Sequence, residues 1–281
     1  AMIVPAPGKD FLVGDFANIE GRVLAWESGE EWKLKAFRDF DAGTGPDIYK
    51  LTYAKSFGVS LASVTKDNRQ VGKVEELALG YGGGVGAFQT MAKGYNVVVS
   101  DGRAEEIKSG WREIHPAVVQ YWYDVEAAAI NATLNPGVFS AGPKGREVKF
   151  RKSGSFLWCR LPSGRAMCYP YPKIMDVRTP WGAQKDALTY FTVVNTTANK
   201  KVIPDPNANG TWQRVSTYGG SLVENITQAT ARDILAEAML RLDPTYPIVM
   251  HVHDEAVAEV DEKLPAIALE EFSVMLSEVP A

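Results

Sequence analysis

Apolar and polar positions divide the chain into three stretches with different periodicity. A short apolar run at 11–16 has β-forming residues and contains an acidic residue near its end, so it predicts a strand. From 18 to 134, apolar residues recur at helical spacing between Gly and Pro interruptions. From 139 onward, short β-type runs alternate with Gly, Pro and Ser turns before a long helical pattern returns.

The helical patterns have recognisable beginnings and ends. Asn18 is an expected N-cap and Gly29 an expected helix end, and the longest pattern is expected to break before Pro116. The predicted helices span 18–27, 30–39, 47–57, 65–80, 85–93, 103–134, 221–242 and 264–276.

The strand patterns predict an antiparallel sheet with helices packed on it. Predicted strands lie at 11–16, within 139–172, and at 189–194, 212–218, 248–252 and 256–260, and loops at 182–186 and 195–210. The order is strand, helical insertion, mixed β region, long helix, hairpin and helix, which is typical of an α+β fold. The insertion is long enough to form a lobe of its own.

Composition allows one large domain or two coupled subdomains in 281 residues. There is no apolar run long enough for a membrane span and no secretory signal pattern, so a cytoplasmic protein is expected. Cys159 and Cys168 provide neither a disulfide framework nor a zinc quartet, and both are expected to be buried small side chains.

The formal net charge of −4 disfavours a protein that coats nucleic acid, but it leaves room for an enzyme with a local basic track. The segment Lys144–Lys152 carries five cations. Either a solvated loop face or part of such a track explains this cluster.

Two aspartates stand where strands end. Asp15 closes the first apolar run, and Asp254 lies at the tip of the predicted hairpin, with apolar residues on both sides of each strand. We therefore expect both in the middle of a sheet, where carboxylates brought together repel unless a divalent metal ion lies between them. A turn-forming role is the structural alternative for Asp254.

Cations recur on the predicted 65–80 helix. Arg69, Lys73, Leu77 and Tyr81 are four residues apart, which forms a slowly rotating stripe along a helix. Arg69 and Lys73 are suited to an anionic group such as a triphosphate, and Tyr81 would offer a flat ring beside the glycines that follow. A solvated basic face with Tyr81 packed at the helix end is the alternative.

These motifs, in this order, resemble those of the family A DNA polymerases. The segment 15–25 (DFANIEGRVLA) is similar to that family's first polymerase motif, Arg69-x3-Lys73-x3-Leu77-x3-Tyr81-Gly82 to its second, and His253-Asp254-Glu255 to its third. The stretch 222–235 (LVENITQATARDIL) looks most like the bacteriophage branch.

The resemblance implies a polymerase palm with a helical fingers subdomain. It assigns residues 1–28 and 136–281 to the palm and 29–135 to the fingers. The thumb and the exonuclease domain are expected to be absent from this sequence and supplied by an upstream region or another chain. The implied partners are primer–template DNA and a dNTP, the implied cofactors two Mg²⁺ ions, for which Mn²⁺ can substitute, and the implied location the cytoplasm of a bacterial host.

The resemblance also implies residue roles. Asp15 and Asp254 are the implied metal ligands, and Glu255 supports the primer end. The implied dNTP-binding residues are Arg69, Lys73, Leu77, Tyr81 and Glu20, with Lys73 assisting pyrophosphate departure and Glu20 closing the space of a ribose 2′-hydroxyl. The implied DNA contacts are Gln228, His253 and Arg232.

The chain also departs from the family pattern. Leu77 stands where an aromatic residue is usual, which puts sugar discrimination in question, and Tyr49 stands where a phosphate-contacting histidine is common. Gly220 and Glu224 occupy positions where polar or basic DNA contacts are usual, so no DNA role is carried over to them.

Two other functions remain open from the sequence. His251, His253 and Asp254, with Asp15, are residue types that ligate zinc in metal-dependent hydrolases. A catalytically weak DNA-binding remnant of a polymerase is the other possibility. The tryptophans, including Trp111, Trp122 and Trp158, are expected in the core, and His115 is expected to be a capping or core residue.

Overall fold

The computed structural model describes residues 3–179, 182–196, 202–204, 211–263 and 267–278. The chain forms two compact units. The terminal unit combines Ala1–Val23 with Thr227–Ala281, and the central unit comprises Leu24–Ile226. The expected division into palm and fingers has different boundaries and stays a prediction. Among the described helices, none has both the length and the apolar character that a membrane crossing requires.

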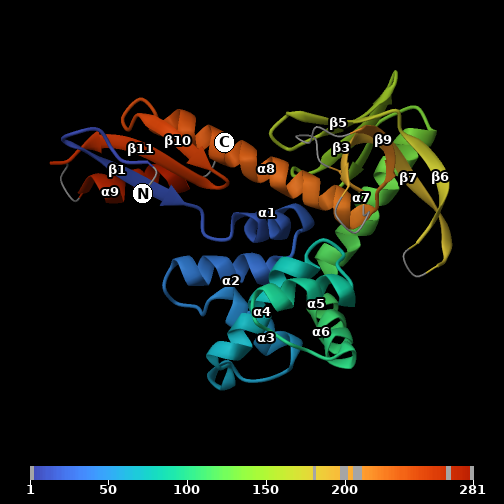
Figure 1. Ribbon diagram of the computed structural model, residues 1–281, viewed down its shortest axis with the longest axis horizontal. Helices are drawn as coiled ribbons and strands as arrows, with labels where there is room; N and C mark the ends of the chain where they lie inside the picture. Colours follow the sequence, from blue (N-terminus) through green and yellow to red (C-terminus); the bar gives the residue numbers. More distant parts are fainter. Residues whose placement is uncertain (1–2, 180–181, 197–201, 205–210, 264–266, 279–281) are drawn as a thin grey trace. The chain divides into compact units, whose positions relative to one another are not determined.

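The terminal unit is a three-stranded antiparallel sheet packed against two helices (Figure 1). The strands lie in the order β1 (Lys9–Asp15), β11 (Glu255–Asp261) and β10 (Ile248–Val252). The C-terminal part of α8 (Gly219–Leu242) and α9 (Ile267–Ser277) share one core with β11. The buried members of this core are Leu235, Ala238, Leu242, Tyr246, Ala256, Ala258, Val260, Ala268, Phe272 and Leu276.

The position of β1 corrects one expectation. Within the described sheet, β1 pairs only with β11 and is an edge strand, and Asp15 is exposed. Apolar residues flank Asp15 because Gly14 packs against α9: a Cβ at that position would lie 2.5 Å from Leu276 Cδ2. The apolar residues beside Asp15 are therefore explained by a helix that packs on β1, and they do not indicate that β1 lies in the middle of the sheet.

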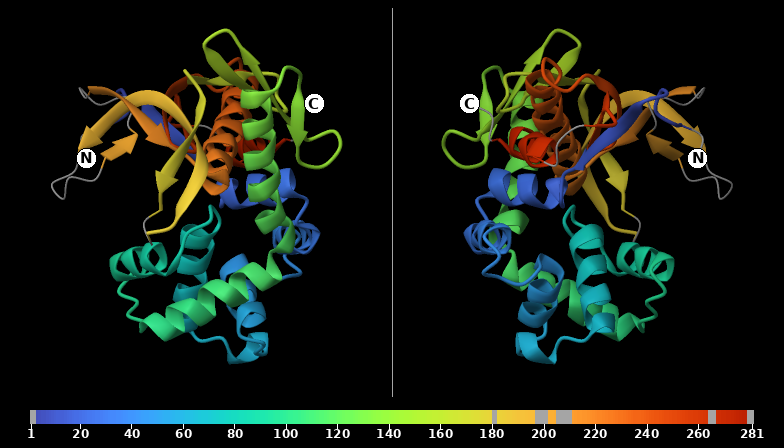
Figure 2. Two further views of the ribbon diagram at one scale, coloured as in Figure 1. Left: turned by 90° about the vertical axis from the view of Figure 1, so that its right-hand side faces the viewer. Right: turned by 90° about the vertical axis from the view of Figure 1, so that its left-hand side faces the viewer.

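The central unit begins with a group of helices whose ends follow local signals (Figure 2). Asp47, Thr65 and Ser100 each accept a backbone N–H hydrogen bond as N-caps. The expected break before Pro116 is confirmed, because α6 ends at Ile114 and α7 begins at Pro116. The helices are α1 (Ile19–Ser28, shared with the terminal unit), α2 (Glu31–Asp41), α3 (Ile48–Ser56), α4 (Lys66–Leu79), α5 (Val85–Gly94), α6 (Asp101–Ile114) and α7 (Pro116–Leu134), with a 3₁₀ turn at Leu61–Ser63.

Two antiparallel sheets complete the central unit. One has the order β2-β3-β4-β5, and in the other β7 pairs with β6, β8 and β9. Their strands are β2 (Phe139–Ala141), β3 (Val148–Ser153), β4 (Phe156–Arg160), β5 (Ala166–Pro170), β6 (Lys173–Arg178), β7 (Gln184–Thr196), β8 (Val202–Pro204) and β9 (Thr211–Ser216).

The loop predictions in this region were partly wrong. The expected loop at 182–186 contains the start of β7, because polar Gln184–Asp186 pairs with β6 across a hairpin. The expected loop at 195–210 contains the end of β7 and β8, and its other residues lie outside the described part of the chain. Exposed polar strands lack the apolar alternation on which the strand predictions depended.

The expected burial of the tryptophans and cysteines was also only partly confirmed. Trp111 and Trp122 are buried, as are His115 and Cys159. Trp158 is 38% exposed, however, because it lies on the outward face of β4, between the buried residues Leu157 and Cys159. Cys168 is exposed for the same reason, since it pairs with Trp158 across the ladder.

Helices α3 and α4 pack so closely that one glycine is required between them. A Cβ at Gly72 would lie 2.1 Å from the backbone oxygen of Tyr49. We expect Gly72→Ala to lower the free energy of unfolding by about 2 kcal/mol, because the two helices would have to separate. In urea unfolding, the matched variant Gly86→Ala should gain up to about 1 kcal/mol, since nothing lies within 4 Å of a Cβ there and alanine favours the helix. Equal stability of the two variants would contradict this interpretation of the contact.

Candidate functional site

The carboxylates of the terminal unit meet at one end of its sheet. Asp15, the last residue of β1, pairs with Glu255, the first residue of β11. Asp254 lies in the two-residue connection that precedes β11, and its carbonyl accepts a hydrogen bond from Phe16 N–H at 3.3 Å. His253 has a φ of +52°, a conformation that suits such a tight hairpin. Three carboxylates therefore come from adjacent backbone positions.

The three carboxylates at this end of the sheet repel one another. Partial burial raises the pKa of Asp15, and the nearby carboxylates of Asp254 and Glu255 raise it further. Among the described residues, neither Asp15 nor Asp254 forms an ion pair with a lysine or arginine. In the described part of the chain, these negative charges thus lie together with no paired cation beside them. A divalent cation fits this arrangement, because Mg²⁺ is commonly held by one or two carboxylates together with substrate phosphates.

The zinc alternative has no matching cluster. Within the described residues there is no group of three or more His, Cys, Asp and Glu side chains arranged to hold a metal ion, so a cation at Asp15 and Asp254 would need further ligands from substrate or water. His251, on β10, pairs with Ala256 of β11 and is exposed, and His253 in the turn is exposed as well. The sequence spacing had suggested a shared ligand set, and the described structure does not assemble it.

The other candidate residues of the terminal unit are exposed to solvent. Glu20 is the second residue of α1. Gln228 and Arg232 are four residues apart on α8, so they lie on one helical face. All of these side chains are exposed, and their individual roles stay predictions.

In the central unit, α4 carries the predicted cations. The Arg69 guanidinium lies 3.1 Å from Asp47, the N-cap of α3, and 5.1 Å from the centre of the Tyr49 ring. The Lys73 ammonium lies 5.0 Å from the centre of the Tyr95 ring. Both cations are therefore held over aromatic rings, and Lys73 has no carboxylate partner among the described residues.

The end of the predicted stripe differs from the expected geometry. Helix α4 ends at Leu79, so Tyr81 lies in the turn beyond it rather than on a continued helical face. Its carbonyl accepts a hydrogen bond from the Tyr218 hydroxyl at 3.3 Å. Gly220 packs against the same carbonyl, where a Cβ would lie 2.1 Å away. Leu77 remains on the helix and is 38% exposed.

Helix α4 also holds two buried acids that were not predicted from the sequence, and one of them, Glu76, lies seven residues after Arg69 and so on nearly the same side of the helix. Glu76 forms an ion pair with Lys33 of α2 and accepts a hydrogen bond from the Thr52 hydroxyl at 2.8 Å. Burial alone would raise the pKa of Glu76, but the Lys33 ammonium and the His115 ring hold it well below its usual range. Burial raises the pKa of Glu75 to about 8, against the effect of its hydrogen bond from Ser56. The sequence did contain a sign of these buried acids, because Glu75 and Glu76 lie between two apolar residues, Val74 and Leu79, that are fully buried.

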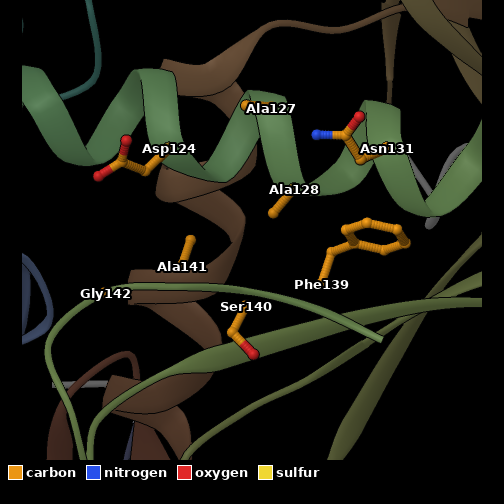
Figure 3. Close-up of a pocket in the computed structure, with 8 residues that line it drawn as sticks. All are labelled: Asp124, Ala127, Ala128, Asn131, Phe139, Ser140, Ala141 and Gly142. Atoms are coloured by element: carbon orange, nitrogen blue, oxygen red, sulfur yellow. The ribbon is translucent and has the colours of Figure 1, made fainter. Parts of the chain in front are cut away.

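A groove elsewhere in the central unit is separate from these residues. It has a volume of about 340 Å³ and lies between α7 and the β2 segment, with Asp124, Asn131, Phe139 and Ser140 along its walls (Figure 3). None of the candidate metal, nucleotide or DNA residues lines it.

Known proteins resemble this chain in sequence and in fold. Residues 1–140 match DNA polymerase family A. The fold is similar to the POL domain of Pol1 from M. smegmatis, solved in complex with DNA primer-template and dNTP, with a TM-score of 0.55 and 17% identity over 97% of this chain and 37% of that chain. Residues 1–140 therefore belong to DNA polymerase family A by sequence, and the structural likeness shows a shared fold.

Among individual relatives, the chain is similar to the DNA polymerase of Bacillus phage SP02. The two are 43% identical over 263 residues, which cover 92% of this chain and 36% of the phage protein. A shorter match, 38% identical over 79 residues, links 28% of this chain to 8% of the DNA polymerase I of Chloroflexus aurantiacus. The chain thus spans about a third of the length of the phage polymerase.

Proposed function

We propose that this chain is the catalytic region of a DNA-templated DNA polymerase. It transfers a dNMP from a dNTP to a primer 3′-hydroxyl and releases pyrophosphate. One observation carries the proposal: Asp15 and Asp254, the two acids of the family motifs, lie close together, and the Asp254 carboxylate raises the pKa of Asp15. The similarity to a phage DNA polymerase over most of the chain supports it.

Asp15 and Asp254 would hold two Mg²⁺ ions, or Mn²⁺ in their place. Such ions, when bound, lower the pKa of an attacking hydroxyl and neutralise phosphate charge. Glu255 pairs with Asp15 across the sheet and would help to orient the primer end from there. The exposed position of Asp15 leaves room for substrate oxygens beside the carboxylates.

Arg69 and Lys73 would bind the triphosphate, because both present positive charge from one face of α4. Lys73, which has no carboxylate partner among the described residues, would donate hydrogen bonds to the departing pyrophosphate. Tyr81 would contact the sugar and templating base beside Leu77. Glu20 would exclude a ribose 2′-hydroxyl by occupying its space.

Gln228, Arg232 and His253 would contact primer–template DNA, where exposed amide, guanidinium and imidazole groups offer hydrogen-bond donors. The proposal also assigns residues 1–28 and 136–281 to a palm and residues 29–135 to fingers.

Primer extension tests the proposed function. The 281-residue chain is assayed alone and also in place of the matching region of the SP02 polymerase, on a primed template with Mg²⁺ and all four dNTPs. Templated extension by the chimera is the expected result. A folded chimera that binds dNTP but never extends a primer would instead indicate a catalytically inactive remnant.

A single lysine tests the triphosphate role. We expect Lys73→Ala to lower kcat/KM for dNTP about 30-fold in that chimera, since a charge-assisted contact to phosphate is worth roughly 2 kcal/mol. The control Lys66→Ala removes an exposed lysine from the first residue of the same helix and should change kcat/KM by less than about twofold. If the two substitutions lowered kcat/KM equally, the effect would come from the net charge of the helix, and the specific role of Lys73 would be rejected.

A further inference from the structure

Five aromatic side chains form a continuous strip across the two sheets of the central unit. In order along the strip they are Trp158, Phe156, Tyr171, Phe191 and Trp212. Their successive ring centroids are 5.7, 6.4, 6.0 and 6.1 Å apart. Each ring thus touches the next, from β4 to β9, and we call this set the aromatic strip.

The strip faces solvent instead of a core. On β4, Phe156 and Trp158 alternate with the buried side chains of Leu157 and Cys159. Phe156 and Trp158 are 37% and 38% exposed, Tyr171 and Trp212 are each 52% exposed, and Phe191 between the last two is half-buried. Aromatic rings are among the side chains that gain most from burial, so a contiguous exposed set indicates a surface that receives a ligand.

The backbone holds the central ring of the strip in a strained position. Tyr171 has a φ of +50°, which is rare for a bulky residue. Its N–H donates to the Ser155 carbonyl at 2.6 Å, and its own carbonyl accepts from the Arg214 guanidinium at 2.9 Å. Hydrogen bonds on both sides of the residue therefore fix the ring between Phe156 and Phe191.

Positive charge accompanies the rings. Lys149 and Arg160 pair directly across β3 and β4 on the same outward face as Trp158, and Arg151 pairs with Trp158 itself. None of these three cations forms an ion pair with a described residue. Arg214 lies 4.6 Å from the centre of the Phe191 ring. Two of the five cations of the basic cluster found in the sequence, Lys149 and Arg151, thus lie on the outward side of a strand, beside exposed rings.

Carboxylates are absent from the same face of the described strands. Asp176 and Asp186 pair with each other on the opposite face of β6 and β7. The acid nearest in sequence to Lys149 and Arg151 is Glu147, just before β3, and its carboxylate accepts a hydrogen bond from the backbone N–H of Gly145. In a chain with a net charge of −4, this face is therefore locally cationic and complementary to an anion.

We infer that the aromatic strip binds single-stranded nucleic acid, with bases stacked on the rings and phosphates beside Lys149, Arg151 and Arg160. Exposed rings flanked by cations are the features that single-stranded DNA recognises. An unpaired strand is favoured over a duplex, because its bases can leave their neighbours and expose a face to a protein ring. This site shares no residue with the proposed metal and nucleotide site, so the inference stands apart from the proposed function.

Fluorescence anisotropy with a labelled oligothymidylate of about 16 nucleotides tests the inference, without Mg²⁺ or dNTP. We expect Trp158→Ala and Trp212→Ala each to weaken binding by about 5- to 150-fold, the range for removal of one stacking ring. Tyr123→Ala is the control, because Tyr123 is a 61% exposed aromatic residue on α7 outside the strip, and it should bind as the unmodified chain does.

The phosphate interactions have a separate readout. The double variant Arg151→Ala/Arg160→Ala should reduce the slope of log affinity against log salt by about 1.4, or about 0.7 for each phosphate that the protein no longer neutralises. Trp158→Phe and Trp212→Phe should retain most of the affinity, because a ring remains, and circular dichroism confirms that each variant is folded. Since no metal or dNTP is present, failure of the proposed polymerase activity would leave these results unchanged.

Three results would overturn the inference. They are the absence of oligothymidylate binding by the unmodified chain, equal affinities for the Trp158→Ala, Trp212→Ala and Tyr123→Ala variants, and binding of a duplex as tight as that of the single strand. Sedimentation of the same variants gives a fourth: a dimer that dissociates on removal of either ring would assign the strip to an interface between two protein copies.

Discussion

Asp254→Asn is expected to reduce nucleotide incorporation in the SP02 chimera by about a thousandfold, because one of two metal-holding carboxylates is removed and metal ions contribute several kcal/mol to phosphoryl transfer. The substitution keeps the size of the side chain and the backbone of the turn. Single-turnover incorporation at saturating dNTP measures the effect on the chemical step. The fold should be unchanged in circular dichroism.

The same substitution should stabilise the fold in metal-free buffer. The carboxylates of Asp254 and Glu255, after partial burial, raise the pKa of Asp15 above its usual 3.8. A raised pKa favours the folded state below the usual value and costs stability once the pH passes the raised value. Removing the Asp254 charge should therefore increase the free energy of unfolding by about 0.5 kcal/mol at pH 7, a small gain because Asp15 is exposed and screened, and the gain should vanish below about pH 4.

Asp261→Asn is the matched control for both measurements. Asp261 lies at the other end of β11, where it forms an exposed ion pair with Lys9 at 2.6 Å. Its substitution should change incorporation by less than about twofold, and it should give no gain in stability at pH 7. Full activity of the Asp254→Asn chimera would refute the proposed metal site, and equal reductions in both variants would attribute the effect to general damage to the sheet.

The chemistry of the candidate site was readable from the sequence where it depended on local patterns. Asp15 and Asp254 stand at ends of short β runs, and pairing of β1 with β11 brings those ends together. The expected beginnings of α3 and α4, at residues 47 and 65, are likewise close to those of the structure, where Asp47 and Thr65 cap the helices. Each of these predictions needed only nearby residues and the period of a strand or helix.

The parts that could not be predicted depend on contacts between distant residues. Nothing near Lys33 in the sequence indicates that its partner is Glu76 on another helix. Trp158 was expected in a core because it is large and apolar, whereas the register of β4 turns it outward. The polar start of β7 was expected to be a loop, since it becomes a strand only by pairing with β6. Register and pairing partner decide such cases, and composition does not.

The ion pair of Lys33 with Glu76 should dominate the stability of the helical part. Lys33→Met is expected to lower the free energy of unfolding by about 3–5 kcal/mol at pH 7, because it leaves the Glu76 carboxylate buried without its cation. The deficit should shrink at acidic pH, since the pKa of Glu76 rises once Lys33 is removed and protonation then relieves the buried charge. Urea unfolding at pH 7 and pH 5 measures both effects.

Lys35→Met provides the matched control, two residues further along α2. Lys35 pairs with Asp39 in the same helix, but both side chains are exposed, at 69% and 40%, so its removal should cost no more than about 0.5 kcal/mol. The double variant Lys33→Met/Glu76→Leu should recover most of the stability, because it removes the unpaired charge together with its partner. Similar destabilisation by Lys33→Met and Lys35→Met would show that Glu76 is reached by water and does not depend on Lys33. A large difference between them would establish that α4, the helix that carries Arg69 and Lys73, is anchored by a buried ion pair.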